Sequence, residues 1–285
     1  MRPPPPDIAA LLRGRAAQPV TTGESGAHVV RYARAGARGL YLKAAAVPVD
    51  GSPEGGGPLG GEAARLRWMA ARGVPVPEVR RYAVHEGWEY LVLDEVPGID
   101  AATVASAAAV TSTTGGGSAA RAAVVHALAD ALRRLHATDA ADCPFRHPAS
   151  ARIAEAVERA HRGLVDERDF DEERRGRRAG DLVRELEALR PEAETTRLTH
   201  GDCCLPNVIL RVATRPDGQA DVAVAGFVDC GRAGLADPYQ DLALAARSVA
   251  WNLGPQWVPE LFGRYGIGRV DERKLRFYTL LDEFF

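Results

Sequence analysis

Apolar and polar positions follow two different periods along this chain of 285 residues. In the first third, short apolar runs at 29–32, 40–43 and 88–93 are bounded by turn-forming residues, which predicts β-strands. The runs at 29–32 and 40–43 are expected to pair. A Gly- and Pro-rich stretch at 51–61 predicts a loop, and residues 62–72 carry apolar side chains at helical spacing.

Helical spacing dominates the rest of the chain. Residues 119–136 predict a long amphipathic helix because their apolar side chains fall on one stripe, and residues 181–189 predict a shorter one. The runs at 208–211 and 222–229 are typical of a hairpin, whereas the low-complexity segment 109–117 predicts a loop. The C-terminal region is again helical in pattern, and its expected core residues are Trp251, Trp257, Leu261, Phe262, Tyr265, Leu275, Tyr278 and Leu281.

A break at Pro97-Gly98 marks the expected boundary between two parts of the chain. The predicted fold class is therefore α+β, with a small β-rich lobe over residues 1–96 and a larger, mainly helical lobe over residues 97–285. Hydrophobic residues make up 46% and charged residues 26% of the sequence, as in globular proteins. The net charge of −2 argues against a general nucleic-acid binder, which needs a basic face.

Neither the N-terminal segment nor the cysteines indicate export. The apolar stretch at 8–12 is too short for a signal sequence or a membrane span, so we expect a soluble, cytoplasmic protein without membrane contact. Two of the four cysteines, Cys203 and Cys204, are adjacent, which suits neither a disulfide nor a zinc site. Reduced thiols are the expected state.

The segment from His200 to Asn207 carries the first candidate chemistry, because Asp202 and Asn207 lie five residues apart before a short strand. Phosphoryl transfer needs a carboxylate that receives the proton of the attacking hydroxyl, with oxygen ligands for Mg²⁺ nearby. Protein kinases place Asp and Asn at the same spacing. A His-Gly-Asp triplet alone is a weak signal, and the Asn at this offset strengthens it.

A second aspartate, Asp229, follows an apolar strand and precedes Gly231. Kinases place a metal-binding Asp in this position, and Mg²⁺ accepts a carboxylate, an amide oxygen and phosphate oxygens as ligands. The alternative is an Asp that only caps a turn. The presence of Asp202 and Asn207 favours the metal-binding interpretation.

Two pieces of the first lobe fit the same chemistry. Lys43 ends a strand and Glu62 opens the next helix, as do the kinase lysine that contacts phosphates and its glutamate partner. A solvated lysine and a first-turn acid favoured by the helix dipole are the alternatives. The turn at 22–26, which contains Ser25, offers backbone N–H groups to phosphate oxygens but equally fits a plain hairpin turn.

Taken together, these residues resemble the aminoglycoside 3′-phosphotransferases. The resemblance covers most of the chain, from about residue 20 to its end, and its specific motifs are His200-Gly201-Asp202 with Asn207, the run 227–237, Tyr239-Gln240-Asp241 and the terminal Leu280-Leu281-Asp282-Glu283-Phe284-Phe285. It implies a protein-kinase-like fold that binds ATP as co-substrate, with Mg²⁺, in the interlobe cleft. It also implies phosphorylation of the 3′-hydroxyl of kanamycin- or neomycin-type antibiotics, which confers resistance.

The resemblance assigns roles residue by residue. Asp202 matches the catalytic base, and Asn207 and Asp229 match the Mg²⁺ ligands. The nucleotide side is matched by Lys43, Glu62, Ser25 and the adenine-binding hinge residues Leu93, Glu95 and Val96. The drug side is matched by Asp169, Glu172, Arg232, Asp282, Glu283 and the terminal carboxylate of Phe285.

Electrostatics support the drug side, since aminoglycosides carry several ammonium groups and call for carboxylates. The run from Asp166 to Glu173 is densely acidic, although arginines follow it directly and a solvated charged segment is the alternative. Some family members have an acidic residue near positions 248 and 251, where this chain has Ser248 and Trp251.

Other functions remain open on the sequence. The same fold with another acceptor would give a sugar, choline or macrolide kinase, and loss of activity would give a kinase-like binding protein. The acidic C-terminus argues against a macrolide, and the complete set of expected catalytic residues argues against a silent protein. The expected partners are nucleotide and aminoglycoside, in a monomer or weak homodimer.

Overall fold

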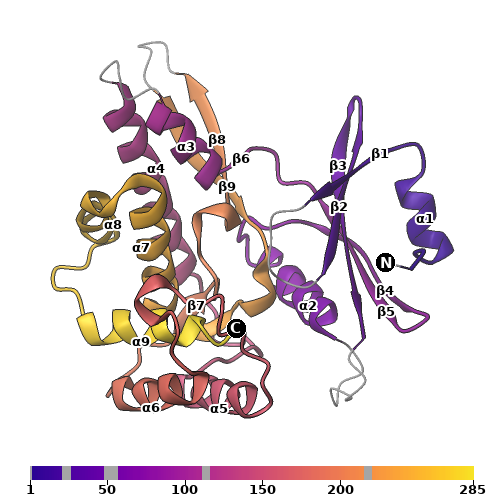
Figure 1. Cartoon of the computed structure of the whole chain (residues 1–285). Helices are drawn as coiled ribbons and strands as arrows, with labels where there is room; N and C mark the ends of the chain where they lie inside the picture. The colour runs from indigo at the N-terminus through magenta and orange to yellow at the C-terminus, as the bar shows by residue number, and fades with distance from the viewer. Residues whose placement is uncertain (1, 21–26, 48–56, 111–115, 215–219) are drawn as a thin grey trace. The chain divides into compact units, whose positions relative to one another are not determined.

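The computed structural model describes residues 2–20, 27–47, 57–110, 116–214 and 220–285 (Figure 1). These residues form two compact units. The first comprises the chain up to Gly98 together with Ala225–Arg232, and the second comprises Ile99–Val224 and Ala233–Phe285. Segment 225–232 belongs to the first unit because the Phe227 N–H donates to the carbonyl of Pro75 at 2.8 Å.

The first unit is built on a five-stranded antiparallel sheet of order β1-β2-β3-β5-β4. Its strands are β1 (Ala16–Val20), β2 (His28–Arg34), β3 (Ala37–Ala46), β4 (Val79–His85) and β5 (Trp88–Asp94), and its helices are α1 (Pro6–Leu12) and α2 (Pro58–Ala70). The predicted pairing of 29–32 with 40–43 is confirmed, because Val29 lies opposite Lys43 and Tyr32 opposite Leu40.

Alternation along β3 decides which way Lys43 points. Leu42 and Ala44 are fully buried on the face that packs against Ile8 of α1. Since successive side chains of a strand point to opposite faces, Lys43 lies on the other face. There its side chain meets Glu62 of α2. The alternation of side chains along β3 thereby places the Lys43 ammonium group beside the buried Glu62 carboxylate of α2.

The second unit is mainly helical. Its helices are α3 (Ala101–Val110), α4 (Gly116–His136), α5 (Ala149–His161), α6 (Ala179–Leu189), α7 (Tyr239–Leu253), α8 (Val258–Tyr265) and α9 (Glu272–Asp282). Its short strands are β6 (Ile99–Asp100), β7 (Arg197–Thr199), β8 (Val208–Thr214), β10 (Gly234–Ala236) and β9 (Ala220–Phe227), whose last three residues pass into the first unit. Strands β6, β8 and β9 form one sheet, and β7 pairs with β10. Short 3₁₀ turns cover Glu172–Arg174, Leu205–Asn207, Cys230–Arg232 and Pro255–Trp257.

One core cluster of this unit joins α5, α6 and α9. Ile153, Leu182, Phe277 and Phe284 are among its buried members. The cluster fixes the C-terminal end of the chain against α5. The Arg152 guanidinium makes a cation–π contact with the Phe285 ring, with its Cζ 3.6 Å from the ring centroid.

Several sequence-based expectations are corrected. The helix expected over 62–72 begins at Pro58, which suits a first helical position, and ends at Ala70. The loop expected over 109–117 is wrong at both ends, because α3 runs to Val110 and α4 starts at Gly116; only 111–115 lie outside the described residues. The alanine-rich sequence of α3 sustains that helix to Val110.

Trp251 is also not a core residue. It lies near the end of α7 with 89% of its surface exposed, whereas Leu261, Phe262, Tyr278 and Leu281 are buried as expected. Helical spacing identifies a stripe of apolar residues but does not say which part of it another element covers. All four cysteines are free thiols, as predicted. No helix in the described part of the chain has the length and apolar character to span a bilayer.

Candidate active site

In the first unit, Lys43 joins two carboxylates that are far apart in sequence. Its Nζ donates to Glu62 Oε1 at 2.8 Å and to Asp229 Oδ1 at 3.0 Å. Burial by itself lowers the pKa of Lys43, but the charges of Glu62 and Asp229 outweigh it and raise the pKa above its ordinary value. Lys43 is therefore a permanent cation held in one position.

The backbone presents Asp229 in an unusual conformation. Its φ of +59° lies in the left-handed region, which a non-glycine residue rarely adopts. The strained turn directly follows β9 and is anchored by the Phe227–Pro75 hydrogen bond. The Asp229 side chain keeps 41% of its surface exposed, whereas that of Glu62 keeps 4%. Glu62 is therefore buried and positions Lys43, whereas the Asp229 carboxylate has surface that is accessible to a ligand.

The predicted hinge residues continue from β5. Leu93 is buried in the strand, and the Glu95 carboxylate accepts from Arg31 Nε at 2.8 Å. The Glu95 N–H is also engaged, because it donates to the carbonyl of Gly39 at 2.9 Å. Within the described residues the Val96 N–H has no hydrogen-bond acceptor, which leaves it as the amide donor of this segment. Ser25 lies outside the described residues.

In the second unit, Asp202 and Asn207 lie on one short loop. The Asn207 Nδ2 donates to the Asp202 carbonyl at 3.0 Å and to its Oδ2 at 3.1 Å. The turn Leu205–Asn207 brings the Asn207 side chain back to Asp202. At the start of the loop, Gly201 adopts a φ of +87°, which lets the backbone turn sharply. Because the Asn207 amide nitrogen faces Asp202, its oxygen remains available as a metal ligand.

Asp241, to which the sequence analysis gave no role, anchors the loop that carries Asp202 and Asn207. Asp241, fully buried on α7, accepts the N–H of His200 and the N–H of Gly201, both at 2.8 Å. His136 Nε2 lies 3.0 Å from the same carboxylate. Burial raises the pKa of Asp241, but the hydrogen bond and charge of His136 and the His200 amide more than offset it, so the pKa lies below its ordinary value. The sequence signal that could have identified Asp241 is a charged residue beside the apolar run of α7.

A second contact ties α7 to the same loop. The Leu205 N–H donates to Ser248 Oγ at 2.9 Å. Ser248 therefore supports the loop that carries Asp202 and Asn207. Cys204, between the two anchored stretches, has its pKa raised to about 12 by burial and by the charge of Asp202, so its thiol stays protonated and unreactive.

The acidic segment divides into paired and unpaired carboxylates. Asp166 is paired with Arg168 and Glu167 with Arg178. The exposed side chains of Asp169 and Glu172, both predicted drug contacts, have no ion-pair partner among the described residues. They remain available to a cationic ligand.

The acids near the C-terminus are partly neutralised by two arginines that the sequence analysis missed. Arg174 Nη1 lies 2.9 Å from Glu283 Oε1, and Arg247 pairs with Asp282 and, at 3.2 Å, with Asp171. Burial, together with the charge of Asp171, raises the pKa of Glu283 to about 7. The side chain of Glu283 is 4% exposed, so its contact with a drug stays a prediction.

Arg232, the remaining predicted residue, ends the turn Cys230–Arg232 in the first unit and is half-buried. Within the described residues, no cluster of three or more His, Cys, Asp or Glu side chains is arranged to hold a metal ion. Asp229 in the first unit offers an accessible carboxylate and Asn207 in the second an amide oxygen, and each is an oxygen ligand of the kind that Mg²⁺ accepts.

Known proteins similar to this chain identify its family. Residues 53–278 match the phosphotransferase enzyme family. An aminoglycoside 3′-phosphotransferase of Streptomyces fradiae is 40% identical over 232 residues, 80% of this chain and 80% of that protein. The crystal structure of an aminoglycoside 3′-phosphotransferase of type VIII has a TM-score of 0.78 and 36% identity, with 98% of each chain covered. A Streptomyces rimosus aminoglycoside phosphotransferase solved with ADP and streptomycin has a TM-score of 0.74 and 31% identity, again with 98% of each chain covered.

Replacing Asp241 tests its support of the loop. In Asp241→Asn one acceptor oxygen is lost, so a buried N–H of His200 or Gly201 is left unsatisfied, at a cost of about 1–3 kcal/mol. We expect a lower denaturation midpoint and a fall in turnover, measured by urea unfolding and ADP release. Asp221→Asn, at an exposed position of β9, is the matched control. Unchanged stability of Asp241→Asn would contradict the anchoring role.

The raised pKa of Glu283 predicts a pH-dependent stability. Because the folded protein binds this proton more tightly than the unfolded chain, the stabilisation is complete below the ordinary value of 4.5 and is lost as the pH rises through about 7. Wild type should therefore lose stability relative to Glu283→Gln between pH values of about 5 and 8. Thermal midpoints of both proteins across this range measure it, with Glu173→Gln as an exposed control. A constant difference would refute the shift.

Proposed function

The chain belongs to the phosphotransferase enzyme family, among its aminoglycoside 3′-phosphotransferases, and we propose that it transfers the γ-phosphate of ATP to the 3′-hydroxyl of a kanamycin- or neomycin-type drug, conferring resistance. The observation that carries the proposal is the Lys43–Glu62–Asp229 arrangement together with the Asp202–Asn207 loop. These are the groups that phosphoryl transfer uses, and each is held in place by its neighbours.

In the proposed reaction, Asp202 orients the drug hydroxyl and receives its proton. The hydroxyl oxygen forms a bond to the γ-phosphorus while the bond between that phosphorus and the bridging oxygen of ADP breaks. Lys43 contacts the phosphates of the nucleotide, and the Val96 N–H donates to the adenine. Asp229 and Asn207 would hold Mg²⁺, which neutralises phosphate charge when bound. Positioning and electrostatics supply most of the acceleration.

Carboxylates recognise the drug in this proposal. Asp169 and Glu172 are exposed and without ion-pair partners among the described residues, so they bind ammonium groups directly. Asp282 and Glu283 and the terminal carboxylate of Phe285 complete the set, with Arg232 near the reacting groups. Because Arg247 already pairs with Asp282, a drug ammonium competes with this resident cation.

The setting of the enzyme follows from the same features. Four free thiols suit the reducing cytoplasm, where ATP is also available. We propose that the protein acts there as a monomer or weak homodimer. Phosphorylation of streptomycin is the second candidate function, because the Streptomyces rimosus relative bound to that drug covers nearly the whole chain.

Replacing the catalytic carboxylate tests the mechanism. Asp202→Ala should lower kcat by about two or more orders of magnitude with little change in the KM for ATP, because the carboxylate acts on the acceptor. Steady-state ADP release at saturating drug measures both constants. Asp221→Ala, an exposed Asp of β9, serves as control and should stay within about twofold of wild type. Near-full turnover of Asp202→Ala would reject the role.

An acceptor panel tests reaction and position together. We expect ADP release with kanamycin and none above background with its 3′-deoxy analogue, since only the former offers the attacking oxygen. Turnover with streptomycin alone would favour the second candidate. Release that is equal with both kanamycin compounds would place the reaction at another hydroxyl, and turnover only with sugars or choline would overturn the drug assignment.

A further inference from the structure

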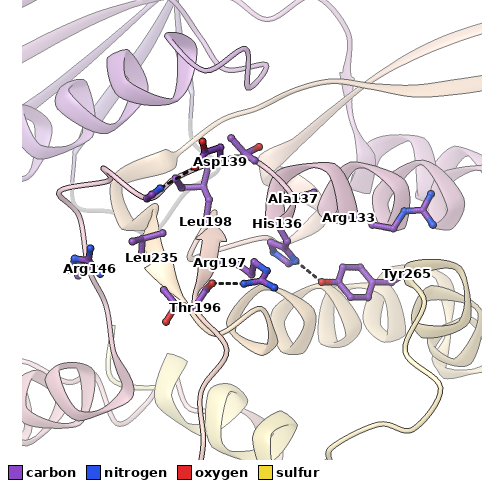
Figure 2. Close-up of a pocket in the computed structure, with 13 residues that line it drawn as sticks. Arg133, His136, Ala137, Asp139, Arg146, Thr196, Arg197, Leu198, Leu235 and Tyr265 are labelled. Atoms are coloured by element: carbon purple, nitrogen blue, oxygen red, sulfur yellow. Dashed lines mark hydrogen bonds between the residues drawn. The ribbon is translucent and has the colours of Figure 1, made fainter.

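Buried carboxylates that accept backbone N–H groups occur in both units. In the second unit this residue is Asp241, and its neighbour His136 is held by the Tyr265 hydroxyl, 2.8 Å from Nδ1, at the edge of a hollow of about 710 Å³ (Figure 2). In the first unit it is Glu89 of β5, which is fully buried. The sequence analysis gave Glu89 no role. A buried carboxylate is costly unless hydrogen bonds offset the loss of its hydration, so its partners are informative.

Glu89 caps the N-terminus of α2 from a different element of the fold. The Leu59 N–H donates to Glu89 Oε2 at 3.2 Å, and the Gly60 N–H donates to Glu89 Oε1 at 3.0 Å. The first N–H groups of a helix have no acceptor within the helix, and Gly57 at the N-cap has no side chain to supply one. The helix dipole also favours a negative charge at this end. The Glu89 carboxylate therefore fixes the first turn of α2 on β5.

Tyr82 of β4 and Gly60 complete this contact. The Tyr82 hydroxyl donates to Glu89 Oε1 at 2.6 Å, and burial, together with the hydrogen bond to Glu89, raises the pKa of Tyr82, so the phenol remains a donor. A Cβ atom at position 60 would lie 2.8 Å from that hydroxyl oxygen and 3.3 Å from Glu89 Oε1. Glycine is a poor helix former, and this close approach explains why it occupies the first turn.

The face of the sheet that carries Glu89 also carries Lys43. In the pairing of β3 with β5, Ala45 lies opposite Glu89, and Lys43 is two residues from Ala45 on the same strand. Directly opposite residues and residues two apart share one face of a sheet. Helix α2 is thus held at two points of this face, with its N-terminus on the Glu89 carboxylate and Glu62, two residues after Gly60, on Lys43 Nζ. The place where Glu89 holds the first turn therefore determines where Glu62 meets Lys43.

We propose that Glu89 is a positioning residue for the pair that contacts the nucleotide: through the first turn of α2 it holds Glu62 against Lys43. The proposal rests on the function proposed above for Lys43, whereas the contacts of Glu89 with α2 do not. Without the Glu89 charge, the buried N–H groups of Leu59 and Gly60 lose their acceptor and the first turn is released from the sheet. Glu62 then moves with the helix, and Lys43 loses the acid that fixes its position.

Acetylation of the two lysines tests this role without requiring catalysis. The chain contains only Lys43 and Lys274, and Lys274 of the second unit, paired with Asp237 at 2.7 Å, is an internal reference with similarly low exposure. In Glu89→Gln we expect N-hydroxysuccinimidyl acetate to modify Lys43 about tenfold or more faster than in wild type, with Lys274 unchanged, as measured by peptide mass spectrometry. Glu78→Gln, which removes an exposed acid of the first unit, should leave both rates within about twofold.

Two neighbouring glycines provide a matched pair of variants that keep the carboxylate, which maintains the test if Glu89→Gln fails to fold. A Cβ atom at position 60 meets the Tyr82 hydroxyl, whereas one at position 61 meets only the end of the flexible Arg65 side chain. Both substitutions by alanine favour a helix. We expect Lys43 to be acetylated about threefold or more faster in Gly60→Ala and at the wild-type rate in Gly61→Ala.

Kinetics connect the position of the helix with the nucleotide. Glu89→Gln should lower kcat/KM for ATP by about tenfold and leave the KM for kanamycin within about twofold, because Lys43 contacts the nucleotide and not the acceptor. Wild type without turnover would reject the proposed function, and the acetylation rates would still decide the role of Glu89. Unchanged Lys43 acetylation in Glu89→Gln and Gly60→Ala, equal acceleration at Lys43 and Lys274, or an unchanged kcat/KM for ATP in Glu89→Gln would overturn that role.

Discussion

A buried carboxylate holds in place the loop that carries Asp202, the proposed catalytic base. Asp241 receives the amides of His200 and Gly201 and contacts His136, so the backbone that carries Asp202 has no freedom to shift without leaving a charge unsatisfied. Removing one partner of such a buried arrangement lowers the stability of the fold by more than the hydrogen bonds contribute to it. The reason is that the remaining polar groups are left buried without a hydrogen-bond partner. One helix therefore fixes this loop, because α7 supplies Asp241 and, two turns later, Ser248.

In each unit, charged side chains of the candidate site are already paired with opposite charges in the absence of a ligand. Glu62 and Asp229 hold Lys43, and Arg247 and Arg174 hold Asp171, Asp282 and Glu283. Pairing fixes the side chains and reduces the reorganisation that binding demands. Under the proposed function, a cationic drug meets some acids that arginines already neutralise, so its recognition depends more on Asp169 and Glu172. The exposed Trp251, one turn beyond Arg247 on α7, adds aromatic surface to this side of the helix.

The sequence by itself determined the features that depend on local spacing. Asp202 and Asn207 are in contact because they lie five residues apart around a tight turn. The alternation of side chains along β3 places Lys43 on the opposite face of the strand from Leu42. Only the tertiary structure decided which distant groups meet: Lys43 with Asp229 across 186 positions, Arg247 with Asp171 and Asp282, and the burial of Asp241. It also left Trp251 exposed. The physical reason is that sequence spacing fixes contacts within one element or turn, whereas packing between elements selects the partners and the buried faces.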